Sequence, residues 1–235
     1  PVAFPTAEGA AAALPPPCYA VRQRAWTALN PMSTRAESAL TKVLDASNPR
    51  HRARALWLLG KIAGKGQTYV EKAIADPNED IRIVGLRLAR QLKDVDTISV
   101  VEKLVKDRSP SVRRECSIAL RHSKSPKAPF LWSELAAQHD GKDRWYLEAL
   151  GIGSDLRADE CFAAWLKKAG NNWNTPPGHD IVWRSRSKAA MPYMAKILIN
   201  PKTPKEQHAR YMRSFDFHPK GREKDAALEA ILLEQ

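Results

Sequence analysis

Apolar residues recur every three or four positions along most of the chain, as they do on the buried face of an amphipathic α-helix. Segments 39–44 (ALTKVL), 69–74 (YVEKAI) and 98–105 (ISVVEKLV) all have this spacing. The strict alternation of apolar and polar residues that marks a half-buried strand is absent from the sequence. The pattern therefore predicts an all-α fold.

One arginine recurs among these predicted helices at a nearly constant interval. It stands in the pattern apolar–Arg–x–x–small–x–x–x–apolar, with His51 as the one imperfect apolar position. The intervals of 30, 30 and 31 residues separate the first four copies, a further 31 leads to the fifth, and two looser copies follow. The seven arginines are Arg22, Arg52, Arg82, Arg113, Arg144, Arg184 and Arg210. Such a period is typical of stacked two-helix repeats, so we expect seven repeats, five of them regular.

An aspartate precedes each of four arginines by four to seven residues, and proline lies in three of the joints. The Asp/Arg pairs are Asp45/Arg52, Asp76/Arg82, Asp107/Arg113 and Asp140/Arg144, and the prolines are Pro49, Pro77 and Pro110. Because proline can start a helix but cannot continue one, each Asp is expected to end one helix and each Arg to lie in the first turn of the next.

This spacing resembles the HEAT repeat, in which an Asp ends the first helix six residues before an Arg opens the second. The resemblance implies that the Asp and Arg side chains form a hydrogen-bonded ladder between successive repeats, so these arginines are assigned a structural role. It also implies a right-handed α-solenoid over residues 18–235, regular over 19–153 and irregular over 154–235. Residues 1–17, rich in Ala and Pro, are predicted to be a poorly ordered linker.

In a HEAT repeat the Arg-bearing helix lines the concave surface, and positions one, five and eight after the Arg lie opposite the buried face. These positions and the equivalent part of the sixth repeat give a candidate partner-binding surface of Trp57, Arg87, Arg90, Arg114, Arg121, Trp145, Trp183 and Arg184. Two alternatives stay open. The arginines could pair with nearby acids such as Glu79 and Glu115, and a small error in helix phase would bury Trp57 and Trp145.

A Gly/Asn/Pro segment at 170–179 interrupts the period, and five tryptophans lie between residues 132 and 183. Loops that interrupt a solenoid often carry function. The alternative interpretation is that the aromatic residues fill the core of an irregular pair of repeats.

Composition narrows the function classes. Lys and Arg outnumber Asp and Glu by 38 to 26, a formal charge of +12, which favours anionic partners or reflects a solvated surface. The three cysteines form no CxxC or CxxCH motif, so a zinc ribbon, a thioredoxin-like site and covalently attached haem are excluded within this chain. No apolar run approaches the ~18 residues of a membrane span. We found no catalytic motif and no pair of histidines at metal-binding spacing, so no catalytic residue, metal or cofactor is expected.

Several longer sequence segments resemble those of a known protein family. They are RARALWLLGK (52–61), VRRECSIALRH (112–122), DGKDRWYLEALGIG (140–153), DIVWRSR (180–186) and RYMRSFDF (210–217). They resemble the HEAT segment of the large haem-binding, membrane-bound dehydrogenases of planctomycete and verrucomicrobial type. Those exported proteins have a glucose/sorbosone-dehydrogenase-like β-propeller before the HEAT region and a CxxCH cytochrome c domain after it. This chain has neither, so the resemblance implies a periplasmic or exported, non-catalytic scaffold whose partners are the propeller and cytochrome domains.

The competing hypothesis is nucleic-acid binding. In this interpretation Asp143, Trp145, Trp183 and Arg184 imitate the concave site of bacterial HEAT-like-repeat alkylpurine DNA glycosylases. It depends on fold analogy and charge alone, because no motif of that family matches at length.

Overall fold

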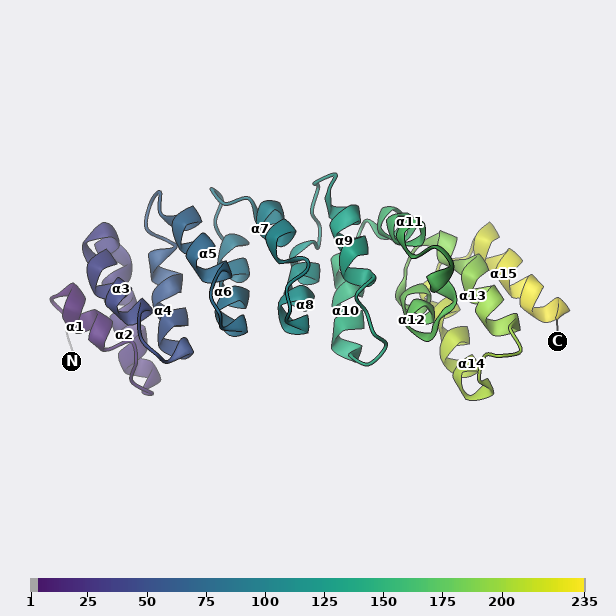
Figure 1. Ribbon diagram of the computed structural model, residues 1–235, viewed down its shortest axis with the longest axis horizontal. Coiled ribbons are helices and arrows are strands. Elements are labelled where there is room, and N and C mark those ends of the chain that lie inside the picture. The colour runs from purple at the N-terminus through teal and green to yellow at the C-terminus, as the bar shows by residue number, and fades with distance from the viewer. Residues whose placement is uncertain (1–3, 235) are drawn as a thin grey trace. The chain divides into compact units, whose positions relative to one another are not determined.

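The computed structural model describes residues 4–234, and these residues form α-helices and short 3-10 helices without a β-strand (Figure 1). The all-α class predicted from the sequence is confirmed. The chain divides into two compact units, Pro1–Leu104 and Val105–Gln235. Each unit consists of helices that pack on one another and are joined by turns.

The first unit contains helices α1 to α7. Their bounds are α1 Ala7–Ala12, α2 Tyr19–Leu29, the 3-10 helix η1 Asn30–Ala36, α3 Glu37–Leu44, α4 Pro49–Leu59, α5 Gly66–Ile74, α6 Glu79–Ala89 and α7 Thr97–Leu104. Helix α3 packs on α4 and α5 packs on α6, while α4 also contacts α6. The second helices of consecutive pairs therefore lie side by side (Figure 1).

The second unit contains helices α8 to α15. Their bounds are α8 Pro110–Ala119, α9 Ala128–Ala136, α10 Arg144–Gly153, α11 Ala158–Ala169, η2 Gly170–Asn174, α12 Pro176–Arg184, η3 Lys188–Ala190, α13 Met191–Ile199, α14 Lys205–Met212, η4 Arg213–Phe217 and α15 Arg222–Leu233. Helix α8 packs on α10, α9 on α11, and α13 on α15. Contacts between alternate helices thus stack successive pairs within this unit.

A capping residue stands four positions before the recurring arginine in three successive helices. Asn48 accepts a hydrogen bond from the backbone N–H of Arg50, Asn78 accepts from two amides of α6, and Ser109 accepts from an amide of α8. Asn and Ser satisfy helix N-termini in this way because their short side chains reach the first unpaired amides. Proline follows directly in α4 and α8, at the first helical position. The capping residue therefore places the recurring arginine in the first turn.

The described part of segment 1–17 is not the poorly ordered linker that its composition predicts. Residues Ala7–Ala12 form α1, which packs against α2 and α3. Ala10, Ala11 and Leu14 are buried in the core of the first unit. Arg54 of α4 donates hydrogen bonds to the Leu14 and Pro15 carbonyl oxygens at 2.7 and 2.9 Å. The prediction was wrong because alanine is also the best helix former and packs closely against neighbouring helices. Residues 1–3 lie outside the described residues.

Glycines mark close helix contacts in each unit. A Cβ atom at Gly85 of α6 would lie 2.8 Å from the Cβ of Ala73 on α5. A Cβ atom at Gly153 of α10 would lie 2.4 Å from the backbone oxygen of Ser117 on α8. The Ser117 hydroxyl also donates a hydrogen bond to the Ala149 carbonyl oxygen at 3.0 Å. Larger residues at either glycine would force the helices apart.

Candidate interaction surface

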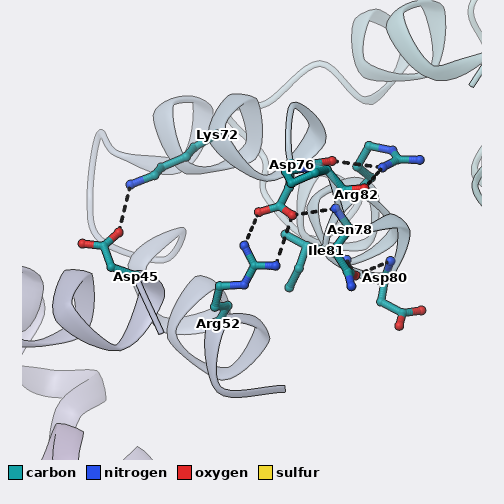
Figure 2. Close-up of polar contacts among 9 residues, drawn as sticks. Asp45, Arg52, Lys72, Asp76, Asn78, Asp80, Ile81 and Arg82 are labelled. Carbon is teal, nitrogen blue, oxygen red and sulfur yellow. Dashed lines mark hydrogen bonds and ion pairs between the residues drawn. The ribbon is translucent and has the colours of Figure 1, made fainter. Parts of the chain in front are cut away.

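Arg52 forms a bidentate side-chain contact with Asp76 in the first unit (Figure 2). Two guanidinium nitrogens of Arg52 donate to the two carboxylate oxygens of Asp76 at 2.6 and 3.2 Å. The same carboxylate accepts the backbone N–H of Asn78 at 2.8 Å. The two side chains are 18% and 14% exposed. The contact joins α4 to the turn between α5 and α6, so an aspartate binds the arginine of the preceding helix pair, not the one that follows it in sequence.

Three other recurring arginines hold backbone carbonyls of the turn before their own helix. Arg82 donates to the Asp76 and Pro77 oxygens at 2.9 and 3.0 Å. Arg113 donates to the Asp107 and Arg108 oxygens at 2.7 and 3.3 Å. Arg22 repeats this arrangement on the carbonyls of Pro16 and Pro17. In each case the acceptors lie six and five residues before the arginine, so these side chains stabilise the interhelical turns.

Asp45 departs from the expected ladder. Its carboxylate lies 3.8 Å from the Lys72 ammonium, and both side chains are more than half exposed (Figure 2). The turn after Asp45 is one residue longer than the turn after Asp76, and a cavity of about 280 Å³ lies beside it, lined by Arg52, Asp76 and Lys72 among others. Asp107 instead accepts the Ser109 amide at 2.8 Å, as Asp76 does with Asn78.

The fourth predicted pair, Asp140 and Arg144, is out of register with the others. Arg144 is the first residue of α10 and its side chain is 84% exposed, while Asp140 accepts the Lys142 amide at 2.9 Å. The N-cap of α10 is Asp143, which accepts the amides of Trp145 and Tyr146. Counting four residues from this cap, as in α4, α6 and α8, leads to buried Leu147. The assignment of Arg144 to the ladder was therefore wrong, because a longer turn through Gly141 shifts the start of the helix by three residues.

Five of the candidate partner-binding residues lie on the outer faces of α4, α6 and α8. Arg87, Arg90 and Arg121 are exposed, and Trp57 and Arg114 are partly exposed. The Arg121 guanidinium donates to Asp155 at 3.0 and 3.1 Å, with the His122 ring 2.9 Å from the same carboxylate oxygen. Arg114 lies 3.9 Å from Asp143. Local acids therefore contact Arg114 and Arg121, as the alternative interpretation of these residues expects.

Trp183 and Arg184 are not presented to solvent as their selection assumed. The Arg184 guanidinium packs against Gly151 of α10 and donates to Glu148 at 3.2 Å, and its side chain is only 18% exposed. The Trp183 indole N–H donates to the Arg210 carbonyl oxygen at 2.9 Å. Both residues therefore join α12 to its neighbours. The prediction that both residues face a partner was wrong because α12 begins at an irregular turn, after the segment 170–179 that interrupts the repeat period.

Asp180 connects three helical segments of the second unit. Its two carboxylate oxygens contact His139, after α9, at 3.0 Å and Arg210 of α14 at 2.7 Å. Burial raises the pKa of Asp180, but hydrogen bonds from His139 and Arg210 lower the pKa more, so it lies below the ordinary aspartate value. The Arg210 guanidinium also lies 4.4 Å above the centre of the Trp183 ring. The periodicity revealed Arg210 as a repeat position, but nothing in it indicated this cluster.

A cavity of about 310 Å³ opens beside this cluster. Its lining residues are His139, Gly141, Lys142, Arg144, Leu147, Glu148, Asp180, Trp183 and Arg210. At its edge the first turn of α10 places Arg144, 84% exposed, next to Trp145, which is 69% exposed. We call Lys142, Arg144, Trp145 and Arg210 the α10 surface. In it, three cationic side chains that line the cavity stand beside the exposed Trp145 in the sequence or the fold.

The aromatic residues of the interrupted segment fill the core around it. Trp165 is 3% exposed, and the Trp173 ring contacts Tyr193 edge-to-face with centroids 4.9 Å apart. Gly178 lies so close to the Trp173 carbonyl that a Cβ atom there would be 2.3 Å from it. The turn at 170–179 is thus packed tightly onto α12, which favours core filling for its aromatic residues.

Neither metal-site geometry nor similarity assigns a function. No three His, Cys, Asp or Glu side chains within residues 4–234 are grouped so that they could hold a metal ion. Over the same range, no helix has the length and apolar character needed to cross a bilayer. No protein-family model matches this chain, and comparison with curated proteins finds no significant relative.

Proposed function

We propose that this chain is a non-catalytic interaction domain built from HEAT-like repeats, and that its docking site is the α10 surface. One observation carries the proposal. The carboxylates around the cavity are paired with neighbouring helices, while Trp145 and Arg144 extend from the first turn of α10 with 69% and 84% exposure. Tryptophan and arginine are the residues most enriched at the energetic centres of protein interfaces.

The polar groups next to these exposed residues support a binding role over a chemical one. Asp180 is held by His139 and Arg210, and Glu148 is held by Arg184. A general acid or base must exchange protons with a substrate, whereas these carboxylates are held in contacts between helices. The arrangement is suited to a rigid surface with a preformed shape.

The repeat architecture belongs to the same proposal. The arginine interval of 31 residues from Arg82 to Arg113 continues across the boundary at residue 104. We propose that the helix pairs continue as one right-handed solenoid over residues 18–235. A compact 235-residue protein would have a radius of gyration of about 17–18 Å. Small-angle X-ray scattering of the chain should give a clearly larger value, and a value within the compact range would contradict the solenoid.

The sequence resemblance suggests where such a domain operates. We propose that it connects a β-propeller dehydrogenase to a c-type cytochrome within a longer exported protein. The test is isothermal titration of the 235-residue chain with separately produced propeller and cytochrome domains of a dehydrogenase of that class. Binding of either domain with a Kd below about 10 μM, weakened at least fivefold by Trp145→Ala, is the expected result.

The control for this titration is Phe130→Ala. Phe130 of α9 is 61% exposed and lies in the same unit, so its removal takes away a similar exposed ring without touching the α10 surface. If Trp145→Ala and Phe130→Ala weakened binding equally, or if neither domain bound the chain, the proposal would be contradicted. Tight, salt-sensitive binding to duplex DNA in place of either domain would favour the nucleic-acid alternative, because phosphate contacts weaken steeply between 50 and 200 mM salt.

A further inference from the structure

Cationic side chains outnumber carboxylates on the lining of the cavity beside α10, and this excess indicates which kind of ligand the cavity can bind. Three cationic side chains line it, Lys142, Arg144 and Arg210, against two carboxylates, Glu148 and Asp180. Both carboxylates are already matched. Asp180 contacts His139 and Arg210, and Glu148 lies 3.2 Å from Arg184, a residue outside the lining, and 4.0 Å from Arg144.

The cations retain most of their hydrogen-bonding capacity. A guanidinium has five N–H donors, and Arg210 uses one nitrogen for Asp180 at 2.7 Å while its side chain stays 40% exposed. Arg144 is 84% exposed, and Lys142 is exposed on the turn that precedes α10. Asp140 and Asp143 on that turn accept backbone amides and do not line the cavity, and Asp143 also lies 3.9 Å from Arg114. The cavity therefore has unused donors that suit an oxyanion.

The walls of the cavity add an apolar contribution. Arg210 is stacked on the Trp183 ring at 4.4 Å, which orients the guanidinium, and Leu147 forms part of the floor. Trp145, which is 69% exposed, follows the lining residue Arg144 directly in the sequence. A ligand that fits must bring negative charge into the cavity and apolar atoms against Trp145.

We propose that this cavity is a receptor for an acidic protein segment, with a carboxylate of the partner seated between Lys142, Arg144 and Arg210 and an apolar neighbour against Trp145. This inference rests on the proposed function and names the chemistry of the partner. An acidic protein segment is favoured over nucleic acid because Glu148 and Asp180 also face the cavity. Although each is paired with a cation, their negative charge disfavours a continuous phosphate backbone across the cavity, whereas a single carboxylate side chain can be seated against the three cations.

The test uses the 235-residue chain and a fluorescein-labelled ten-residue peptide of alternating glutamate and leucine, read by fluorescence anisotropy at 50 mM salt. The key variant is Lys142→Glu, matched by Lys220→Glu. Lys220 is also exposed and in the same unit, and its substitution changes the net charge by the same amount. We expect Lys142→Glu to weaken binding at least tenfold and Lys220→Glu to weaken it less than twofold.

Two further measurements locate the contact. The same peptide with glutamine in place of glutamate should not bind, since the cations require a charged partner. In protein labelled with ¹⁵N-tryptophan, the indole signals of Trp145 and Trp183 should shift on titration while that of Trp57, in the other unit, should not.

Any of three results would overturn the inference. The two lysine variants could lose peptide affinity equally, or the acidic peptide could fail to bind. A 20-base-pair DNA duplex could also bind more tightly than the peptide, in a manner that depends on Lys142. Failure here is separable from failure of the proposed function. If the propeller or cytochrome domain binds the chain but Lys142→Glu leaves that affinity unchanged, the domain is an interaction module and this cavity is not its acidic receptor.

Discussion

The contact between Arg52 and Asp76 should couple two helix pairs of the first unit by a measurable free energy. Asp76 accepts two charged hydrogen bonds from Arg52 and one from the Asn78 amide, and both ionic side chains are more than four-fifths covered. Hydrogen bonds to charged groups contribute about 1.5–3 kcal/mol, and removal of one partner from a fully buried pair costs about 3–5 kcal/mol. Because this pair keeps some solvent contact, we expect Asp76→Ala and Arg52→Ala each to lower the free energy of unfolding by about 2–3 kcal/mol.

A double-mutant cycle measures the coupling itself. In the variant with both substitutions, neither partner is left unpaired. Its loss of unfolding free energy should therefore be smaller than the sum of the two single-variant losses by about 1.5–2 kcal/mol. The assay is urea-induced unfolding followed by far-ultraviolet circular dichroism. Asp45 and Lys72, 3.8 Å apart and largely exposed, provide the matched control, for which the coupling should stay below about 0.5 kcal/mol. A coupling for Arg52 and Asp76 as small as that of the control would refute the structural role.

Three other predictions follow from particular contacts. Gly153→Ala should lower the free energy of unfolding by about 1–3 kcal/mol in the same urea assay, because the new methyl group meets backbone of α8, and an unchanged midpoint would contradict the close packing. Asp180→Asn should lower the free energy of unfolding at pH 7, and this loss should shrink as the pH falls below about 4. A carboxylate with a lowered pKa stabilises the fold above its unfolded-state pKa and loses this contribution when it is protonated. Urea unfolding of both proteins at pH 7, 5 and 3 measures the loss, and a loss that stays constant would contradict the prediction. A thiol reagent at pH 8 should modify Cys18 in the native protein, and Cys116 and Cys161 only after unfolding. Burial raises the pKa of Cys161 to about 12 and that of Cys116 further. Rapid modification of all three thiols in the native protein would contradict the burial.

Sequence periodicity predicts the helices of this protein well, for a physical reason. The three-to-four spacing of apolar residues reflects which face of each helix is buried, and Pro49 and Pro110 stand at the first helical positions where proline is tolerated. Cys116, which stands at the small position of the repeat pattern, is fully buried. These features are local, so they can be derived from neighbouring residues alone.

The ladder was predicted only in part, because its partners depend on contacts between helix pairs. The spacing of Asp76 and Arg82 in sequence suggested that they belong together, yet the Asp76 carboxylate binds Arg52 and only its backbone oxygen binds Arg82. Arg144 keeps the interval of 31 residues but not the register, since the turn before α10 is longer. Counting from the capping residue Asp143 would have shown the shift.

The candidate surface was predicted least well. Trp145 was selected as a concave residue and is exposed, but it lies in the first turn of α10 and not at the position after a ladder arginine. Arg184 was selected as exposed and is covered by α10. Lys142 and Arg210, which line the cavity, come from a turn and from a distant helix. Only tertiary packing brings them together, so no spacing rule could have grouped them.

Arginines four residues after a helix cap stabilise the fold, whereas the partner binds at the cavity beside α10, and one paired measurement tests this division. Arg113→Ala and Arg144→Ala remove the same charge from the same unit. Arg113 holds two turn carbonyls and lies 5.8 Å above the Tyr146 ring, whereas Arg144 is exposed at the cavity. We predict that Arg113→Ala lowers the free energy of unfolding by about 2 kcal/mol and leaves affinity for the glutamate–leucine peptide within twofold. Arg144→Ala should change stability by less than about 0.5 kcal/mol and weaken binding at least fivefold. Reversed effects, or the same effect from both substitutions, would contradict this division of roles.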